Sequence, residues 1–293
     1  MERFLQYVLA GLSAGSLYAL VALGLVLIYR STRVLNFAHA DMATVGTFIA
    51  FSMITSGMPF WMAFAIALVA GAVIAVVFYF AALVPAQRKG ANHLGQVILT
   101  LGLALILQGL TVYKWGAEPD RFPFPLSDTK VWKLGPVYVS ELALGTLAAA
   151  AAASLVLYLI TQKTRLGLAM RATSENLQAA QTLGIPTRGV LAFAWGVAAA
   201  LAVVAGVFLA PVLLLDPFFM LDAMFKGLAA AVLGGLNSLP GAVLGGLILG
   251  VAESLGGAYV SLEFKTSLAF ILIVVVLLAR PEGLLGKEFQ ERV

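Results

Sequence analysis

Residues 5–29 read LQYVLAGLSAGSLYALVALGLVLIY, a run of 25 residues without a charged side chain. A helix needs about 20 apolar residues to cross the ~30 Å hydrocarbon core of a bilayer. The apolar core of a secretion signal has only about 7–15 residues, so this run predicts a retained membrane span instead of a cleaved leader. The first helix therefore indicates a membrane fold.

Similar apolar runs recur along the rest of the chain. The five further runs are Phe60–Val84, Leu94–Tyr113, Val137–Ile160, Val190–Leu215 and Leu239–Tyr259. The composition agrees with them, since 61% of the residues are hydrophobic and 11% are charged, against about 25% charged in soluble proteins. A membrane β-barrel would show short alternating strands of about 10 residues instead. We therefore predict an all-α, polytopic transmembrane helical bundle formed by a single domain, residues 1–293.

Three shorter segments complicate the number of spans. They are Asp41–Met58, Met220–Leu236, which contains Asp222 and Lys226, and Thr266–Ala279. Counting all three predicts nine spans, and eight or ten remain open.

The basic residues favour one orientation of this bundle. With nine spans and an outer N-terminus, 11 of the 18 basic residues fall on the inner side. These are Arg30, Arg33, Arg88, Lys89, Lys163, Arg165, Arg171, Arg188, Arg280, Lys287 and Arg292. Cytoplasmic loops carry an excess of Lys and Arg, so the segment within 162–189 is predicted to be cytoplasmic. The Pro-rich stretch Trp115–Pro136 is then the main outer loop, which we interpret as an ordered connector in preference to a lid or a docking surface.

Several kinds of chemistry have no support in the sequence. The absence of cysteine excludes disulfides, thiolate metal sites and cysteine nucleophiles. His39 has no partner histidine at metal-binding spacing, so we predict no metal and no cofactor. The net charge of +4 comes from residues at predicted membrane edges, where they orient the chain, and does not indicate nucleic-acid binding.

Residues 164–189, TRLGLAMRATSENLQAAQTLGIPTRG, form a polar stretch between two apolar runs. Thr173 or Ser174 can cap a helix whose first turn contains Glu175, and Gly184 suits its C-terminal end. The pattern predicts a short cytoplasmic helix, Ser174–Leu183, with Leu177 and Ala180 on one small apolar face. Such a helix either provides a contact for a partner or only covers a loop at the membrane surface.

The same stretch resembles the cytoplasmic loop of the branched-chain amino acid ABC transporter permeases. In that family a Gly, then Arg-Ala, then a short helix ending in Gly-Ile docks into the ATPase subunit. The matching positions are Gly167, Arg171, Ala172, Gly184 and Ile185. Three other stretches resemble the family in the expected order: NFAHAD (36–41), VLGGLNSLPGAVLGGLILGVAESL (232–255) and RPEGLLG (280–286). One departure is Ala40, where the family usually has glycine.

The resemblance implies a permease subunit of an ATP-driven importer in a bacterial-type inner membrane. The chain lacks the G-x-x-x-x-G-K-[ST] nucleotide-binding motif, so ATP hydrolysis is assigned to a separate subunit and no catalytic residue is expected here. The implied partners are a second permease subunit, as a homo- or heterodimer, two cytoplasmic ATPases and an extracytoplasmic substrate-binding protein. Branched-chain amino acids are the leading substrates, with urea, amides and other amino acids as alternatives. The expected ATPase-coupling residues are Gly167, Arg171, Ala172, Glu175, Leu177, Ala180, Gly184 and Ile185.

Polar residues at membrane depth are candidates for the translocation path. Glu253, inside the run 239–259, faces either the path or a structural hydrogen-bonding partner. Gln96, Thr100 and Gln108 share a broad face of one span, and interhelical hydrogen bonding is the favoured interpretation for them. Asn36, His39 and Asp41 start the second span. Either Asn36 and His39 share a helix face, or Asn36 or Asp41 caps the helix while His39 lies in an unwound segment.

Two other functions compete with the importer. An ion-coupled secondary transporter would need intramembrane acids, of which Glu253 is one. A serine hydrolase could use the G-x-S-x-G pattern at 11–15 with His39 and Asp41, but that pattern requires a strand–turn–helix elbow and here lies in an apolar run.

Glycines at 241, 245, 246 and 250 recur at the spacing that lets two membrane helices pack closely.

Overall fold

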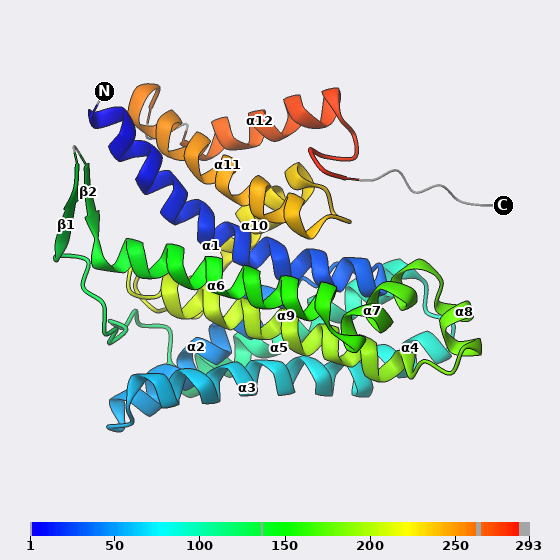
Figure 1. Cartoon of the computed structure of the whole chain (residues 1–293). Helices are drawn as coiled ribbons and strands as arrows, with labels where there is room; N and C mark the ends of the chain where they lie inside the picture. The colour runs from blue at the N-terminus through cyan, green and yellow to red at the C-terminus, as the bar shows by residue number, and fades with distance from the viewer. Residues whose placement is uncertain (1, 136, 262–264, 287–293) are drawn as a thin grey trace.

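The computed structural model describes residues 2–135, 137–261 and 265–286, and it is a bundle of long helices with a small hairpin at one end (Figure 1). Six helices in this part of the chain are long and apolar enough to cross a membrane. They are α1 (Glu2–Thr32), a continuous helix over Phe60–Arg88, α5 (His93–Trp115), α6 (Glu141–Lys163), α9 (Thr187–Leu209) and α11 (Leu239–Tyr259). The six long apolar runs of the sequence are thereby confirmed as helical over most of their length, although the helix in the run Val190–Leu215 already ends at Leu209.

The continuous helix over Phe60–Arg88 changes its winding once. It consists of α3 (Phe60–Phe78), a π-helical turn η1 (Tyr79–Leu83) and α4 (Val84–Arg88). Pro85 lacks an N–H and its ring would clash with the carbonyl of the preceding turn in a regular helix. The wider π turn accommodates this proline without a break in the span.

The three segments of uncertain length are also helices, but shorter ones. They are α2 (His39–Thr55, 17 residues), α10 (Leu221–Gly234, 14 residues) and α12 (Lys265–Ala279, 15 residues). Most residues of α2 and α10 are buried by the surrounding helices. The irregular backbone before α2, with Val34, Asn36 and Ala38 buried, lies inside protein, where a membrane protein tolerates it. The total of nine spans stays a prediction.

The buried centre of the bundle is formed mainly by α1 and α9, with α2 and α10 beside them. The outer helices α3, α5 and α6 instead expose many of their apolar side chains. On α5 these include Leu94, Ile98, Leu105 and Leu110. A surface of this kind suits lipid or another membrane helix, because both are as apolar as leucine.

The most extensive helix pair joins the first long helix to the last, α1 to α11. A Cβ atom at Gly250 would overlap the backbone of Gly11 and Gly15, and one at Gly246 would overlap Ala19. The two helices therefore meet backbone to backbone, and the close packing predicted from the glycine spacing is confirmed.

A small antiparallel hairpin was not predicted. β1 (Val131–Leu134) pairs with β2 (Val137–Ser140), with Val131 opposite Ser140. The sequence indicated one helical run from Val137, which is wrong for its first four residues. Ser140 is the N-cap of α6 because its hydroxyl accepts a hydrogen bond from the Ala143 N–H, so the helix begins only at Glu141.

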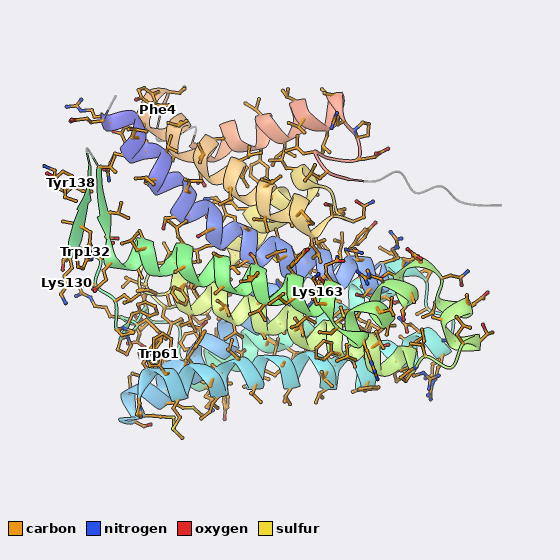
Figure 2. All side chains as sticks on the ribbon, in the orientation of Figure 1. Phe4, Trp61, Lys130, Trp132, Tyr138 and Lys163 are labelled. Carbon is orange, nitrogen blue, oxygen red and sulfur yellow. The ribbon has the colours of Figure 1, made fainter. Side chains whose placement is uncertain are left out.

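The hairpin marks one end of the molecule. Lys130, Trp132 and Tyr138 lie at the same end as Phe4 and Trp61, whereas Lys163 lies toward the opposite end (Figure 2). The side chain of Gln6 hydrogen-bonds both backbone groups of Tyr138, which holds the hairpin against α1. The end that holds Phe4 and Lys130 thus corresponds to the predicted outer side, and the end toward Lys163 corresponds to the predicted inner side.

The stretch Arg280–Gly286 closes the C-terminal end of α10. The N–H groups of Leu284 and Leu285 donate to the carbonyls of Leu233 and Gly234. These carbonyls belong to the last turn of α10 and would otherwise lack helical partners. Two residues counted in the orientation argument, Lys287 and Arg292, lie outside the described part of the chain.

Candidate functional site

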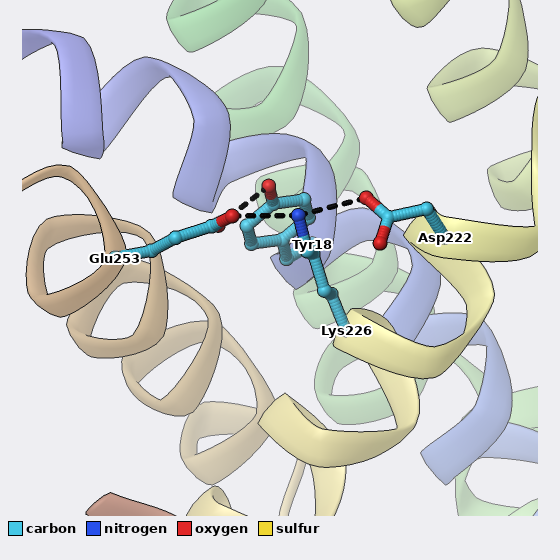
Figure 3. A network of polar contacts seen from close by, with 4 residues as sticks. All are labelled: Tyr18, Asp222, Lys226 and Glu253. Carbon is cyan, nitrogen blue, oxygen red and sulfur yellow. Dashed lines mark hydrogen bonds and ion pairs between the residues drawn. The ribbon is translucent and has the colours of Figure 1, made fainter. Parts of the chain in front are cut away.

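A buried charge network joins α1, α10 and α11. Lys226 Nζ lies 2.6 Å from Glu253 Oε1 and 2.7 Å from Asp222 Oδ2, and Tyr18 Oη donates to Glu253 Oε2 at 2.8 Å (Figure 3). The Lys226 ammonium also lies 5.4 Å from the centre of the Tyr18 ring. Glu253 and Lys226 are only 2% and 7% exposed. Breaking such a buried pair is costly, so the network fixes the relative positions of three helices.

The network favours one of the two interpretations of Glu253. Both of its carboxylate oxygens are bound by side chains from other helices, which supports the structural interpretation. Asp222 differs, because its side chain is 63% exposed. The buried residues Lys226 and Glu253 therefore hold the helices together, and Asp222 is the member of the network that is accessible from outside.

Asp222 and Lys226 line a cavity of about 420 Å³ at the hairpin end of the molecule. One wall is α1, from Ala10 to Tyr18, and another is the first turn of α6 with Ser140 and Thr146. Leu209, the last residue of α9, and Leu213 after it contribute apolar surface. We call this space the outer cavity.

A second cavity, of about 380 Å³, lies further along the same pair of helices. It is lined by Leu23 and Arg30 of α1, Ser154 and Gln162 of α6, and Leu244 of α11 among others. A smaller one follows between Arg30, Gln162 and Arg171. The three cavities thus follow one another between α1 and α6, from the hairpin end to the α7 end. We call this row of three cavities the α1–α6 seam.

Asn36, His39 and Asp41 are all buried at the start of α2. Asn36 Oδ1 accepts from the Ala38 N–H at 3.1 Å, so Asn36 organises the irregular backbone before the helix. His39 is the first residue of α2, and Asp41 lies in its first turn. The shared-face arrangement of Asn36 and His39 is therefore wrong, as is the unwound position of His39. Asp41 is not a cap, because the backbone turn at Ala38 already starts the helix.

His39 is unusual because neither of its ring nitrogens has a hydrogen-bond partner among the described residues. Its ring packs directly against Gly24 of α1, where a Cβ atom would overlap it. The Val21 carbonyl is near the ring but lacks hydrogen-bonding geometry. The structure thus places His39 at a helix contact, away from the α1–α6 seam.

The polar residues of α5 mostly hold neighbouring segments together. Thr100 Oγ1 accepts from the Phe37 N–H at 3.1 Å. Its hydroxyl has carbonyl acceptors in Val97 at 2.8 Å, within α5, and in Leu35 at 3.3 Å. Gln96 accepts from the Gln87 side chain at 2.9 Å. Gln108 lies beside the carboxylate of Asp41. This geometry supports the interhelical interpretation, and none of the three α5 residues lines the α1–α6 seam.

The polar stretch after α6 forms two helices instead of one. They are α7 (Arg165–Glu175) and α8 (Leu177–Thr182), capped by Thr164 and Asn176. The predicted helix Ser174–Leu183 and its cap at Thr173 or Ser174 are wrong. The hydroxyls of Thr173 and Ser174 bond back to the carbonyls four residues earlier, and Glu175 ends α7.

Other features of this stretch agree with the sequence. Gly184 has φ of +78°, and the Ile185 N–H bonds to the Ala180 carbonyl, which is a glycine-type helix ending. A Cβ atom at Gly167 would overlap the carbonyls of Ile160 and Thr161, so glycine allows α7 to fold against the end of α6. Arg171 bonds to the side chain of Gln162.

The predicted contact face of the short helix needs correction. Leu177 is 44% exposed, but Ala180 is 2% exposed and packs inside the molecule. Ala180 therefore cannot touch a partner on this face. Ala172 and Ile185 are partly buried, while Glu175 and Leu183 are exposed. The accessible apolar side chains are Leu166, Leu168, Leu177 and Leu183.

The hydrolase alternative fails on geometry. Ser13 lies within a regular helix instead of a strand–turn–helix elbow. The His39 ring contacts Gly24, which is 11 residues further along α1, or about 16 Å along the axis. Ser13 and His39 therefore do not meet. The described residues also contain no cluster of three or more His, Cys, Asp or Glu suited to a metal ion.

Sequence reasoning missed Lys226, Tyr18 and Asp222 as site residues. Lys226 enters the sequence analysis only as part of the short segment Met220–Leu236, although a lysine inside an apolar segment is itself a signal of function. Its partner Glu253 lies 27 residues away on another helix, and no local pattern connects the two.

Comparison with known proteins decides the family. A family model described as the branched-chain amino acid transport system / permease component matches residues 7–278. The chain belongs to this family. The high-affinity branched-chain amino acid transport system permease protein LivH of Escherichia coli (strain K12) is 34% identical over 303 residues, which cover 99% of this chain and 98% of LivH. The corresponding BraD protein of Pseudomonas aeruginosa is 33% identical over 304 residues, again covering 99% of this chain and 98% of BraD.

A third relative is somewhat less similar. The probable branched-chain amino acid transport permease protein LivH of Methanocaldococcus jannaschii is 31% identical and covers 94% of this chain and 90% of its own length. Among solved structures, PsaBC from Streptococcus pneumoniae in complex with Fab covers 94% of this permease and 90% of its own chain, with a TM-score of 0.46 and 18% identity.

The family assignment also favours the importer over the two competing functions. This multi-pass membrane protein is a permease component and not itself an enzyme. A permease component belongs to a multi-part transport system, which disfavours a self-sufficient ion-coupled transporter. The family resemblance drawn from the sequence motifs is confirmed.

Proposed function

We propose that this permease carries branched-chain amino acids inward across a bacterial-type inner membrane. The observation that carries the proposal is the family match over residues 7–278, together with relatives of the same length whose names specify these substrates. Urea and amides remain the alternatives that a direct assay must exclude.

The proposed route is the α1–α6 seam. Its support is the row of cavities, from the outer cavity through the space of about 380 Å³ to the inner residues Arg30, Gln162 and Arg171. Outside the cavities, α6 carries exposed apolar side chains such as Leu155 and Leu159. A second permease subunit, identical or related, closes the route from this side in our proposal.

The proposed coupling segment is α7–α8, within residues 162–189. Short capped helices at the end of two spans, α6 and α9, can transmit a displacement that a floppy loop would absorb. Gly167 and Arg171 tie this segment to α6. In our proposal one ATPase binds this segment on each of the two permease subunits, which gives two ATPases in the complex, and a substrate-binding protein delivers the ligand at the hairpin end.

Reconstitution tests the proposed function. The permease would be assembled with its partner permease, ATPases and binding protein in proteoliposomes, and uptake of labelled leucine, isoleucine, valine and urea would be measured. We expect saturable uptake of the three amino acids only with the binding protein and ATP. Uptake driven by a proton or sodium gradient without ATP would favour the ion-coupled alternative, and preferential uptake of urea would overturn the assigned substrate.

A further inference from the structure

The outer cavity has a charge pattern that the transport route alone does not require. Its charged lining residues are Asp128, Asp222 and Lys226. Behind them, Glu253 binds Lys226 at 2.6 Å. Three carboxylates against one ammonium leave this group two negative charges in excess. The excess lies in a cavity with low-dielectric walls, which focuses the field on its contents.

Lys226 is not available as an anion-binding residue. Its ammonium is held by two carboxylates at 2.6 and 2.7 Å, and its side chain is 9% exposed. Asp222, in contrast, is available to a ligand. Lys226 fixes one of its carboxylate oxygens, and 63% of its side chain is accessible. Lys226 and Glu253 therefore position Asp222 at the cavity wall.

The remaining wall offers apolar surface close to this carboxylate. Leu17, Leu142, Leu209 and Leu213 line the cavity together with the small side chains of Ala10 and Ala14. Its volume of about 420 Å³ lies within the range of about 300–1,000 Å³ typical of small-molecule sites. A ligand suited to this wall carries a cationic group at one end and an aliphatic group at the other.

We propose that the outer cavity is a binding site for aliphatic primary ammonium compounds, in which Asp222 receives the ammonium group and the leucines receive the aliphatic group. This inference rests on the proposed function: if the permease carries branched-chain amino acids, this site recognises the ammonium group of the substrate. Lys226 and Glu253 are positioning residues. An aliphatic carboxylate without an amine is repelled.

The charge of the cavity can be measured directly because the chain has no cysteine. Ala10→Cys in the complete permease, in nanodiscs, would be reacted with a cationic and with an anionic methanethiosulfonate. Ser56→Cys, exposed at the end of α2, is the reference. We expect the cation-to-anion rate ratio at position 10 to exceed that at position 56 by about tenfold or more. Equal ratios would overturn the proposal.

Protection of the same cysteine tests recognition. 3-Methylbutylamine should slow labelling of Ala10→Cys most. Leucine should slow it less, because its carboxylate has no available cationic partner among the described lining residues. 4-Methylpentanoate, which lacks the amine, should not slow it. Adding Asp222→Asn should abolish protection by both amines and lower the rate ratio several-fold, while Asp222→Glu, which keeps the charge, should retain most of both effects. The Glu variant also controls for a folding defect.

Three outcomes would contradict the site. They are equal protection by 4-methylpentanoate, no protection by either amine, and unchanged protection in Asp222→Asn. The assay needs neither ATP nor a binding protein. A permease that transports leucine in proteoliposomes but fails this assay would therefore keep the proposed function and lose the ammonium site.

Discussion

At the scale of single residues, the pairing of Lys226 with Glu253 illustrates how a membrane protein keeps charges in its interior. Each charge in isolation would be expensive to bury, yet together with Tyr18 and Asp222 they satisfy one another. The arrangement makes each member depend on the others.

Glu253→Ala should destabilise the permease by about 3–5 kcal/mol, because it leaves Lys226 buried with Asp222 as its remaining carboxylate among the network residues. Glu253→Gln should cost less, since its amide oxygen can still accept from Lys226 while its amide N–H donates to Tyr18 Oη. The measurement is thermal unfolding in detergent with the yield of monodisperse protein. Glu253→Ala combined with Lys226→Met should recover part of the loss. A wild-type melting temperature in the single Ala variant would contradict this account.

At the scale of helices, backbone contact between α1 and α11 leaves no space for a side chain. Gly250→Ala should therefore force the two helices apart and lower the yield of folded permease, since the obstructing atoms belong to the backbone of Gly11 and Gly15. Gly102→Ala, on α5, is the matched control, because a Cβ atom there meets nothing within 4 Å. Size-exclusion chromatography after detergent extraction checks both. Equal loss in the two variants would mean that glycine content, and not helix contact, is decisive.

The short helices α7 and α8 supply a second prediction at this scale. Leu177→Glu should reduce co-purification with the ATPase or uncouple ATP hydrolysis from uptake, because a charge buried without a partner costs several kcal/mol at a docked surface. The membrane fold should survive, since Leu177 is 44% exposed in the chain itself. Gln178→Glu places the same charge on the neighbouring exposed position. Wild-type coupling in Leu177→Glu, or the same defect in both variants, would reject Leu177 as a contact.

At the scale of the whole molecule, the two ends of the bundle should face opposite sides of the membrane. Asp128→Cys at the hairpin end should react with a membrane-impermeant maleimide added outside intact cells, and Gln178→Cys on α8 should react only after the membrane is opened or inverted. No native cysteine interferes. The reverse pattern would overturn the orientation and, with it, the assignment of the coupling segment.

The sequence predicts the features that depend on the pattern of residues within one segment. The apolar runs indicate the six long helices, and the glycine spacing indicates a close helix contact, since both depend on neighbouring residues of one segment. The network of Tyr18, Lys226 and Glu253 could not be predicted, because it joins three helices through tertiary packing. The division of the coupling stretch at Asn176 was missed because Thr173, Ser174 and Asn176 are all plausible caps, and only packing selects among them.

The partnership of α1 with α11 also has a consequence for biosynthesis. Gly11 leaves the ribosome about 240 residues before Gly250, a delay of roughly 12–50 s at ~5–20 residues per second. During that interval the first helix is already in the membrane, with its glycine face turned to lipid or to the insertion machinery. The nascent protein must be sheltered from membrane proteases until α11 is inserted, so chains truncated before residue 239 should be degraded quickly even though they retain five of the six long helices.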